Sequence, residues 1–193
     1  MKRVCVYCGS SEGRDPRYRD AAAQVGRALA ERSLGLVYGG GGIGLMRVVA
    51  DAAMENGGSV IGVIPHGLAA REVAHLGVTE MRVVSSMHAR KALMAELSDA
   101  FLTLPGGFGT FEELFESVTW AQLGIHRKPL GLLNVAGYFD HLVSFVDHAV
   151  AEGFVPAKGR DLVLVGDEPG ALLDRLAVYD APAGPAWITA SES

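Results

Sequence analysis

Seven short apolar segments, each followed by a longer segment with helical periodicity, constrain the fold of this chain most strongly. The expected strands are Arg3–Gly9, Gly35–Gly40, Ser59–Pro65, Met81–Ser85, Ala100–Leu104, Pro129–Asn134 and Leu162–Gly166. The expected helices are about Pro16–Ser33, Gly44–Gly57, Met87–Leu97, Thr110–Ile125, Tyr138–Gly153 and Glu168–Val178. Strict β-α alternation predicts an α/β fold with a doubly wound, mostly parallel sheet and helices on both faces.

The chain length and the apolar runs predict one domain. Strands such as Ala100–Leu104 are continuous apolar runs, which is typical of strands buried on both faces. A chain of 193 residues with 49% hydrophobic content can bury one sizeable core, and no linker divides it. We expect one domain over residues 1–180 and a flexible tail over residues 181–193.

Charge and hydropathy exclude several classes of partner. The net charge is −5 and the sequence pI is about 5.7, so no basic surface is available to follow a nucleic acid backbone. No apolar run approaches the roughly 18 residues of a membrane span, and the first ten residues do not resemble a secretion signal. We therefore expect a cytoplasmic protein with no nucleic acid or membrane partner.

The two cysteines, Cys5 and Cys8, form a C-x-x-C pattern inside the first expected strand. Positions three apart in a strand point to opposite faces, and no second Cys/His cluster completes a set of four metal ligands. The six histidines are scattered. We expect two buried thiols and no metal site.

Two glycine-rich loops follow expected strands, at residues 38–46 (YGGGGIGLM) and 104–113 (LPGGFGTFEE). Glycine permits close approach of the backbone, and the N-terminus of a helix offers free N–H groups to an anion. The first loop contains G-x-G-x-x-G, but no acidic residue follows about 20 positions later, and neither loop is a Walker A motif. Two such loops favour a phosphate site, although a tight turn without ligand is the alternative for each.

Charged residues accompany these loops. The run from Thr110 to Glu113 fits a capping box, in which Thr110 is the N-cap, Glu113 reaches back, and Glu112 is free to face a ligand. A carboxylate at a helix N-terminus is expected to stay ionised. Arg90 and Lys91 lie early in an expected helix, where they oppose its dipole. This position indicates a phosphate or carboxylate partner, with plain solvation as the alternative.

Three motifs closely resemble those of the Lonely Guy family: Pro105–Glu113 (PGGFGTFEE), Met87–Lys91 (MHARK) and Trp120–His126 (WAQLGIH). The similarity covers nearly everything except the tail, including Val6–Ser11, Tyr38–Met46, Gly131–Val135 and Glu152–Phe154. One departure is Arg47, where the family often has Gly, so the sequence leaves the substrate preference at the first loop open.

The resemblance implies a Rossmann-like homodimer that needs no cofactor. It implies release of a free base, typically an N6-modified adenine, and ribose 5-phosphate from a small-molecule nucleoside monophosphate. It does not favour lysine decarboxylation, a label that some members once carried. Arg90 and Glu113 resemble the catalytic pair. Substrate contacts carried over by motif are Glu72, Lys91, Gly106, Gly107, Phe108, Gly109, Thr110, Phe111, Glu112 and Thr119, to which we add Ser10, Gly41 and Gly42 as expected contacts.

The mechanism expected from these residues is hydrolysis through an oxocarbenium-like ribosyl transition state. Glu113 would stabilise the positive charge or orient water, Arg90 would hold the substrate, and the glycine loops would bind the 5′-phosphate. The residues do not identify the group that protonates the departing purine. Two alternatives remain at this point: a hydrolase directed at plain AMP, and a nucleotide-binding module without chemistry.

Overall fold

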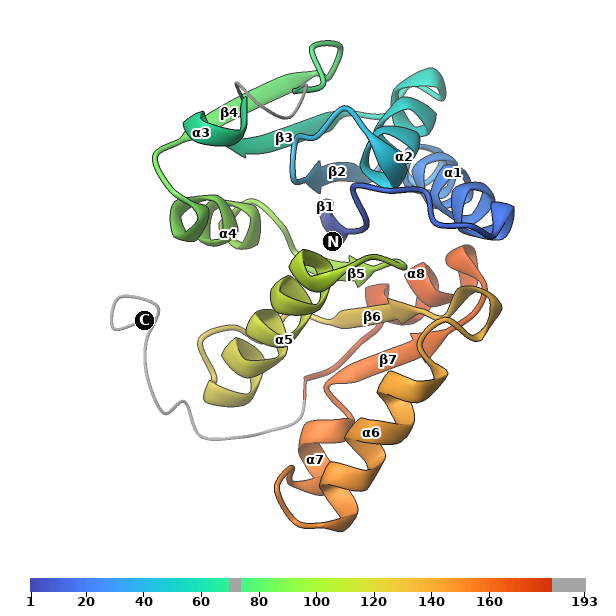
Figure 1. Cartoon of the computed structure of the whole chain (residues 1–193), viewed down its shortest axis with the longest axis vertical. Coiled ribbons are helices and arrows are strands. Elements are labelled where there is room, and N and C mark those ends of the chain that lie inside the picture. The colour runs from blue at the N-terminus through green and yellow to red at the C-terminus, as the bar shows by residue number, and fades with distance from the viewer. Residues whose placement is uncertain (70–73, 182–193) are drawn as a thin grey trace.

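The computed structural model describes residues 1–69 and 74–181 (Figure 1). Within those ranges, seven strands form one sheet in the order β4-β3-β2-β1-β5-β6-β7, and every neighbouring pair is parallel. The ends of each strand lie within about two residues of those expected. The strands are β1 (Arg3–Tyr7), β2 (Gly35–Tyr38), β3 (Val60–Pro65), β4 (Glu80–Val84), β5 (Ala100–Thr103), β6 (Leu130–Leu133) and β7 (Val163–Gly166).

The six expected helices are present, which confirms the α/β fold class. They are α1 (Pro16–Glu31), α2 (Gly44–Glu55), α4 (Met87–Glu96), α5 (Phe108–Leu123), α6 (Asp140–Ala151) and α8 (Pro169–Ala177). Single turns at α3 (His66–Ala69), η1 (Val135–Gly137) and α7 (Ala157–Arg160) were not expected, because one turn is too short to show periodicity. In the part of the chain that the structure describes, no helix is long and apolar enough to span a membrane.

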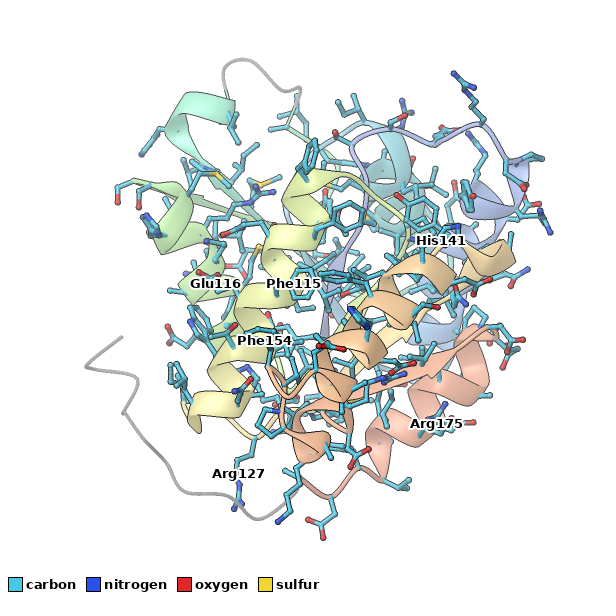
Figure 2. The ribbon with its side chains drawn as sticks, turned by 60° about the horizontal axis from the view of Figure 1, so that its bottom comes forward. Phe115, Glu116, Arg127, His141, Phe154 and Arg175 are labelled. Carbon is cyan, nitrogen blue, oxygen red and sulfur yellow. The ribbon has the colours of Figure 1, made fainter. Side chains whose placement is uncertain are left out.

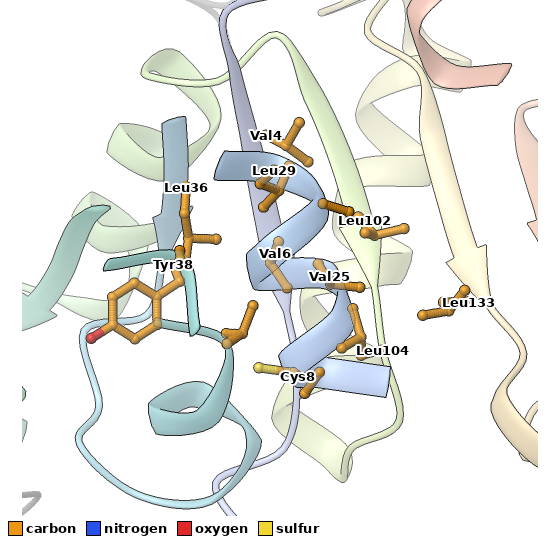
Figure 3. Packing of buried hydrophobic residues seen from close by; sticks show 14 of the residues in the cluster. Val4, Val6, Cys8, Val25, Leu29, Leu36, Tyr38, Leu102, Leu104 and Leu133 are labelled. Atoms are coloured by element: carbon orange, nitrogen blue, oxygen red, sulfur yellow. The ribbon is translucent and has the colours of Figure 1, made fainter. Parts of the chain in front are cut away.

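Alternate residues of β1 enter two hydrophobic cores on opposite faces of the sheet. Val4 and Val6 pack with the apolar sides of α1, α2 and α8 (Figure 3). Cys5 and Tyr7 pack with α4 and α5 on the other face. Figure 1 accordingly shows α1 and α2 on one side of the sheet and α4 and α5 on the other. Cys5 and Cys8 are free, buried thiols that belong to different cores, as the strand period predicts.

The strand order reverses direction at β1. Strands β2, β3 and β4 extend to one side of β1, whereas β5, β6 and β7 extend to the other. The loops after β1 and β5 are tied where they leave the sheet, since the N–H of Gly9 donates to the carbonyl of Pro105 at 3.0 Å. In doubly wound sheets a ligand binds at the carboxyl ends of the strands where the order reverses. The fold therefore places the ligand crevice between β1 and β5.

Candidate active site

A cavity of about 220 Å³ lies at the carboxyl ends of β1, β2 and β5. The residues that line it include Ser10, Gly39, residues 107–110, Arg90 and Glu113. A larger hollow of about 490 Å³ lies between α1 and α8, and none of its lining residues lines the smaller cavity. Charged side chains around that hollow already pair with one another, as Arg32 and Asp174 do at 3.1 Å. The smaller cavity is the candidate active site.

Arg90 is fixed in the wall of this cavity by two strand carbonyls. Its side chain is buried; Nε donates to the oxygen of Val63 at 3.1 Å, and Nη2 donates to the oxygen of Gly39 at 2.7 Å. A Cβ at position 39 would lie 1.9 Å from Nη2, so only glycine leaves room for the guanidinium. Gly39 is a site residue that the sequence reasoning did not assign, although its place at the start of the first glycine loop was visible.

The N-terminus of α5 lacks a side-chain cap. Among the described residues, Gly107 is the N-cap and the helix starts at Phe108, so the expected capping box is wrong and Thr110 lies inside the first turn. The helix begins directly after the loop. There the side chain of Thr110 packs against Gly106, and a Cβ at position 106 would lie only 2.1 Å from the Oγ1 atom of Thr110. The first N–H groups of α5 are therefore left to bind an anion in the cavity.

Three other helices of the described chain have the side-chain cap that α5 lacks. A side chain caps α1 (Asp15), α4 (Ser86) and α8 (Glu168), whereas α2, which reaches the same cavity through Met46, has no side-chain cap. A side-chain cap satisfies N–H groups that an anion would otherwise bind. Of the helices that reach the cavity, α2 and α5 have no capping side chain, whereas α4, which reaches it through Arg90, is capped by Ser86.

Glu113 is a half-buried acid in the wall of this cavity. Burial raises its pKa from 4.5 to about 7, against the opposing effect of the Arg90 guanidinium, and the neighbouring Glu112 raises it further. Burial thus opposes the ionised form that a place near a helix N-terminus favours. Glu113 exchanges its proton near neutral pH. The nearby thiols of Cys5 and Cys8 and the phenol of Tyr7 have raised pKa values because they are buried, so they stay neutral.

Lys91 finds its anionic partners within the chain. Its Nζ contacts Oε1 of Glu112 and lies 2.9 Å from Oε1 of Glu116. Glu112 is half exposed, and its carboxylate is turned to Lys91. The anion that the position of Lys91 indicated is thus a pair of carboxylates on α5.

The structure brings together part of the expected binding set. Ser10, Gly107, Phe108, Gly109 and Thr110 line the cavity with the catalytic candidates. Gly106 lines an adjoining hollow of about 290 Å³, which shares Gly9, Ser10 and Gly107 with the cavity. Tyr7, Cys8 and Met46 also line the cavity; sequence reasoning did not assign them, although the first two stand at the end of an expected strand.

Several expected contacts lie elsewhere. Gly41 and Gly42 do not line the cavity, and Gly41 pairs with Ala74 instead. Phe111 packs in the core beside Leu114, and the hydroxyl of Thr119 donates to the carbonyl of Phe115 at 2.7 Å. Glu72 lies outside the described residues. The guanidinium of Arg47 pairs with Asp51 one turn along α2, at 3.1 Å, and so is held along that helix.

Solved structures share the fold. The molybdenum cofactor binding protein of Rippkaea orientalis aligns with a TM-score of 0.70 at 21% identity, over 92% of this chain and 96% of that one. The molybdenum cofactor carrier protein of Chlamydomonas reinhardtii aligns with a TM-score of 0.69 at 21% identity, over 93% and 99% of the two chains. At this identity the likeness shows the fold alone.

Curated proteins match far more closely in sequence. The cytokinin riboside 5′-monophosphate phosphoribohydrolase LOG of Oryza sativa subsp. japonica is 53% identical over 93% of this chain and 74% of its own length. The cytokinin riboside 5′-monophosphate phosphoribohydrolase LOG7 of Arabidopsis thaliana is 50% identical over 93% of this chain and 83% of its own length. The family model described as "Possible lysine decarboxylase" matches residues 46–176. The chain therefore belongs to the family that this model describes and that includes the cytokinin riboside 5′-monophosphate phosphoribohydrolases.

Proposed function

We propose that this protein hydrolyses the N-glycosidic bond of a cytokinin riboside 5′-monophosphate and releases the free base and ribose 5-phosphate. One observation carries the proposal: Arg90 and Glu113 share a cavity with the uncapped N-terminus of α5. A helix N-terminus suits a phosphate, and an acid beside it suits a sugar that gains positive charge. The relatives named above support the choice of nucleotide.

In the proposed mechanism the 5′-phosphate binds the N–H groups at residues 107–110 and places the ribose beside Glu113. The bond between C1′ and the purine nitrogen breaks, and its electron pair leaves with the purine. Water adds its oxygen to C1′, and the two protons end on the base and on the sugar hydroxyl. Ionised Glu113 stabilises the oxocarbenium charge and accepts the proton of water, while Arg90, held by two carbonyls, keeps the substrate in place.

Chromatographic detection of free base tests this function directly. Purified protein is incubated with N6-isopentenyladenosine 5′-monophosphate and, in parallel, with AMP. We expect base from the isopentenyl nucleotide at a higher kcat/KM than from AMP. A higher kcat/KM for release of adenine from AMP would instead support an AMP-directed hydrolase that acts in nucleotide salvage. Stoichiometric binding without release from either would support a binding module without chemistry.

The phosphate contributes to catalysis in this arrangement, because its binding orients the ribose at the reacting centre. We expect N6-isopentenyladenosine, which lacks the phosphate, to show a kcat/KM at least about tenfold lower than that of its 5′-monophosphate. The two compounds are compared at equal enzyme concentration by the same chromatographic assay. Equal turnover of riboside and ribotide would contradict a phosphate site at α5.

A second copy of the chain is the proposed partner. Phe115, which is 42% exposed, lines an apolar groove of about 230 Å³ between α5, α6 and α7, and Phe145 and Phe154 are 65% and 85% exposed. Figure 2 looks onto this face, with Phe115 and Phe154 labelled. An apolar groove and exposed large aromatic side chains are typical of interaction surfaces. Thr119 lines the groove rather than the cavity.

Solution mass tests the homodimer. We expect light scattering after size exclusion to give twice 20.3 kDa for the native chain, and 20.3 kDa for the double variant Phe145→Asp, Phe154→Asp. Val178→Asp, at an 83% exposed apolar residue after α8, is the matched control and should remain dimeric. A native mass of 20.3 kDa would contradict the dimer.

The reduced state of the two cysteines is one basis for proposing that the protein lies in the cytoplasm. Cys5 and Cys8 are free thiols, which are typical of a reducing environment. Together with the acidic charge balance, this supports a place in the cytoplasm.

A further inference from the structure

A buried ammonium group bridges α4 and α5 directly behind the candidate catalytic pair. The side chain of Lys91 is 7% exposed, and its Nζ contacts one carboxylate oxygen each of Glu112 and Glu116, the latter at 2.9 Å. The two acids are one turn apart on α5, and Figure 2 shows Glu116 on the side of α5 nearer α4. Burying an unpaired ammonium is costly, so this pairing is what allows Lys91 to lie there.

The neighbours of this bridge are the catalytic candidates. Arg90 precedes Lys91 on α4 and is fastened to the ends of β2 and β3, while Glu113 follows Glu112 on α5. These two consecutive residues of α4 thus have different partners. Arg90 binds carbonyls at the ends of strands, and Lys91 binds carboxylates of α5. Since α4 follows β4 and α5 follows β5, on opposite sides of the strand reversal, the bridge joins the two halves of the site.

We propose that Lys91 is a positioning residue for the hydrolysis, and that it acts by holding α4 against α5 through Glu112 and Glu116 rather than by contacting the nucleotide. The inference rests on the proposed function. At least two of the three N–H donors of Lys91 are used by carboxylates, and the side chain does not line the cavity. Its effect on the substrate therefore passes through the spacing of Arg90 and Glu113.

Electrostatics support the same role. Burial lowers the pKa of Lys91, but the hydrogen bonds that its ammonium donates to Glu112 and Glu116 outweigh this effect and leave the pKa raised, so the bridge stays charged. At Glu113, burial and the two neighbouring acids raise the pKa, while Arg90 and Lys91 lower it. Loss of the Lys91 charge should raise the Glu113 pKa further, and loss of the Glu116 charge should lower it.

Kinetics with and without the substrate phosphate separate positioning from direct contact. We expect Lys91→Met to lower kcat by about tenfold on both the ribotide and the riboside, with KM little changed, and Lys91→Arg to restore part of the loss. Lys158→Met, at an exposed lysine on α7, is the matched control. A loss confined to the ribotide, with a raised KM, would show that Lys91 binds the phosphate and would overturn the proposal.

A measurement without turnover completes the test. Carbon-13 NMR of the Glu113 carboxyl group should show its titration midpoint rise in Lys91→Met and fall in Glu116→Gln, in protein whose fold is checked by thermal unfolding. An unchanged midpoint in both variants would overturn the coupling. A native protein that releases no base would refute the proposed function instead, while the NMR shifts would still report whether Lys91 governs the charge state of Glu113.

Discussion

Replacing Glu113 with Gln should lower the rate of base release by about 1,000-fold, the size of effect typical of a residue that stabilises transition-state charge or moves a proton. Gln keeps the shape of the side chain but can neither carry the negative charge nor accept the proton of water. The measurement is chromatographic base release from N6-isopentenyladenosine 5′-monophosphate under single-turnover conditions. Activity within tenfold of the native value would remove Glu113 from the mechanism.

The same substitution should stabilise the fold at alkaline pH. The pKa of Glu113 is raised from 4.5 to about 7, so the folded state binds the proton more tightly than the unfolded chain. Native stability therefore falls as the pH rises from about 4.5 to about 7, by up to roughly 3 kcal/mol. Glu113→Gln removes this cost above pH 7 and changes little near pH 4.5.

Urea unfolding at pH 5 and pH 8 checks this prediction. The native protein and Glu113→Gln should differ more at pH 8 than at pH 5, with the variant more stable. Glu55→Gln, at an exposed position near the end of α2, is the control and should show no such difference. A difference independent of pH would mean that packing, not ionisation, separates the two proteins.

Gly39→Ala should lower kcat/KM for base release by about 100-fold with little change in stability. The new Cβ would overlap Nη2 of Arg90, which is the far end of a flexible side chain, so the guanidinium moves and the backbone does not. The hydrogen bond from Nη2 to the Gly39 carbonyl is then lost, and displacement of a positioning group by about 1 Å can cost this much rate.

The control for this variant is Gly67→Ala. A Cβ at position 67 would meet nothing within 4 Å, so the substitution tests the effect of an added methyl group alone. Both variants are assayed for base release and for thermal unfolding. Full activity in Gly39→Ala would show that the position of the Arg90 guanidinium does not matter to the reaction.

The sequence predicted the fold well because periodicity is a local property. Apolar runs such as Ala100–Leu104 and the helical segments between them fixed the number and type of the main elements, and the resulting parallel sheet confirms them. The start of α5 was missed because it depends on a contact between Thr110 and Gly106, which packing decides. A capping-box pattern alone does not show that the loop already supplies the turn.

The sequence indicated which residue types form the candidate site. It did not indicate how their charges pair or how the pKa of Glu113 is shifted. Lys91 and Glu112 are 21 positions apart, so no local pattern shows that they pair. The raised pKa of Glu113 depends on how deeply its side chain enters the cavity, which the sequence does not record. Gly39 gained its role only when the structure placed the Arg90 guanidinium against it.

The strand order also has a consequence for synthesis. Arg90 belongs to the first half of the chain and Glu113 to the second. They meet only after β5 has paired with the edge of β1 that β2 does not occupy. A nascent chain that ends before β5 holds one member of the proposed catalytic pair without the other. Catalytic competence therefore appears only late in folding, and a bound nucleotide stabilises the finished domain without stabilising its N-terminal half.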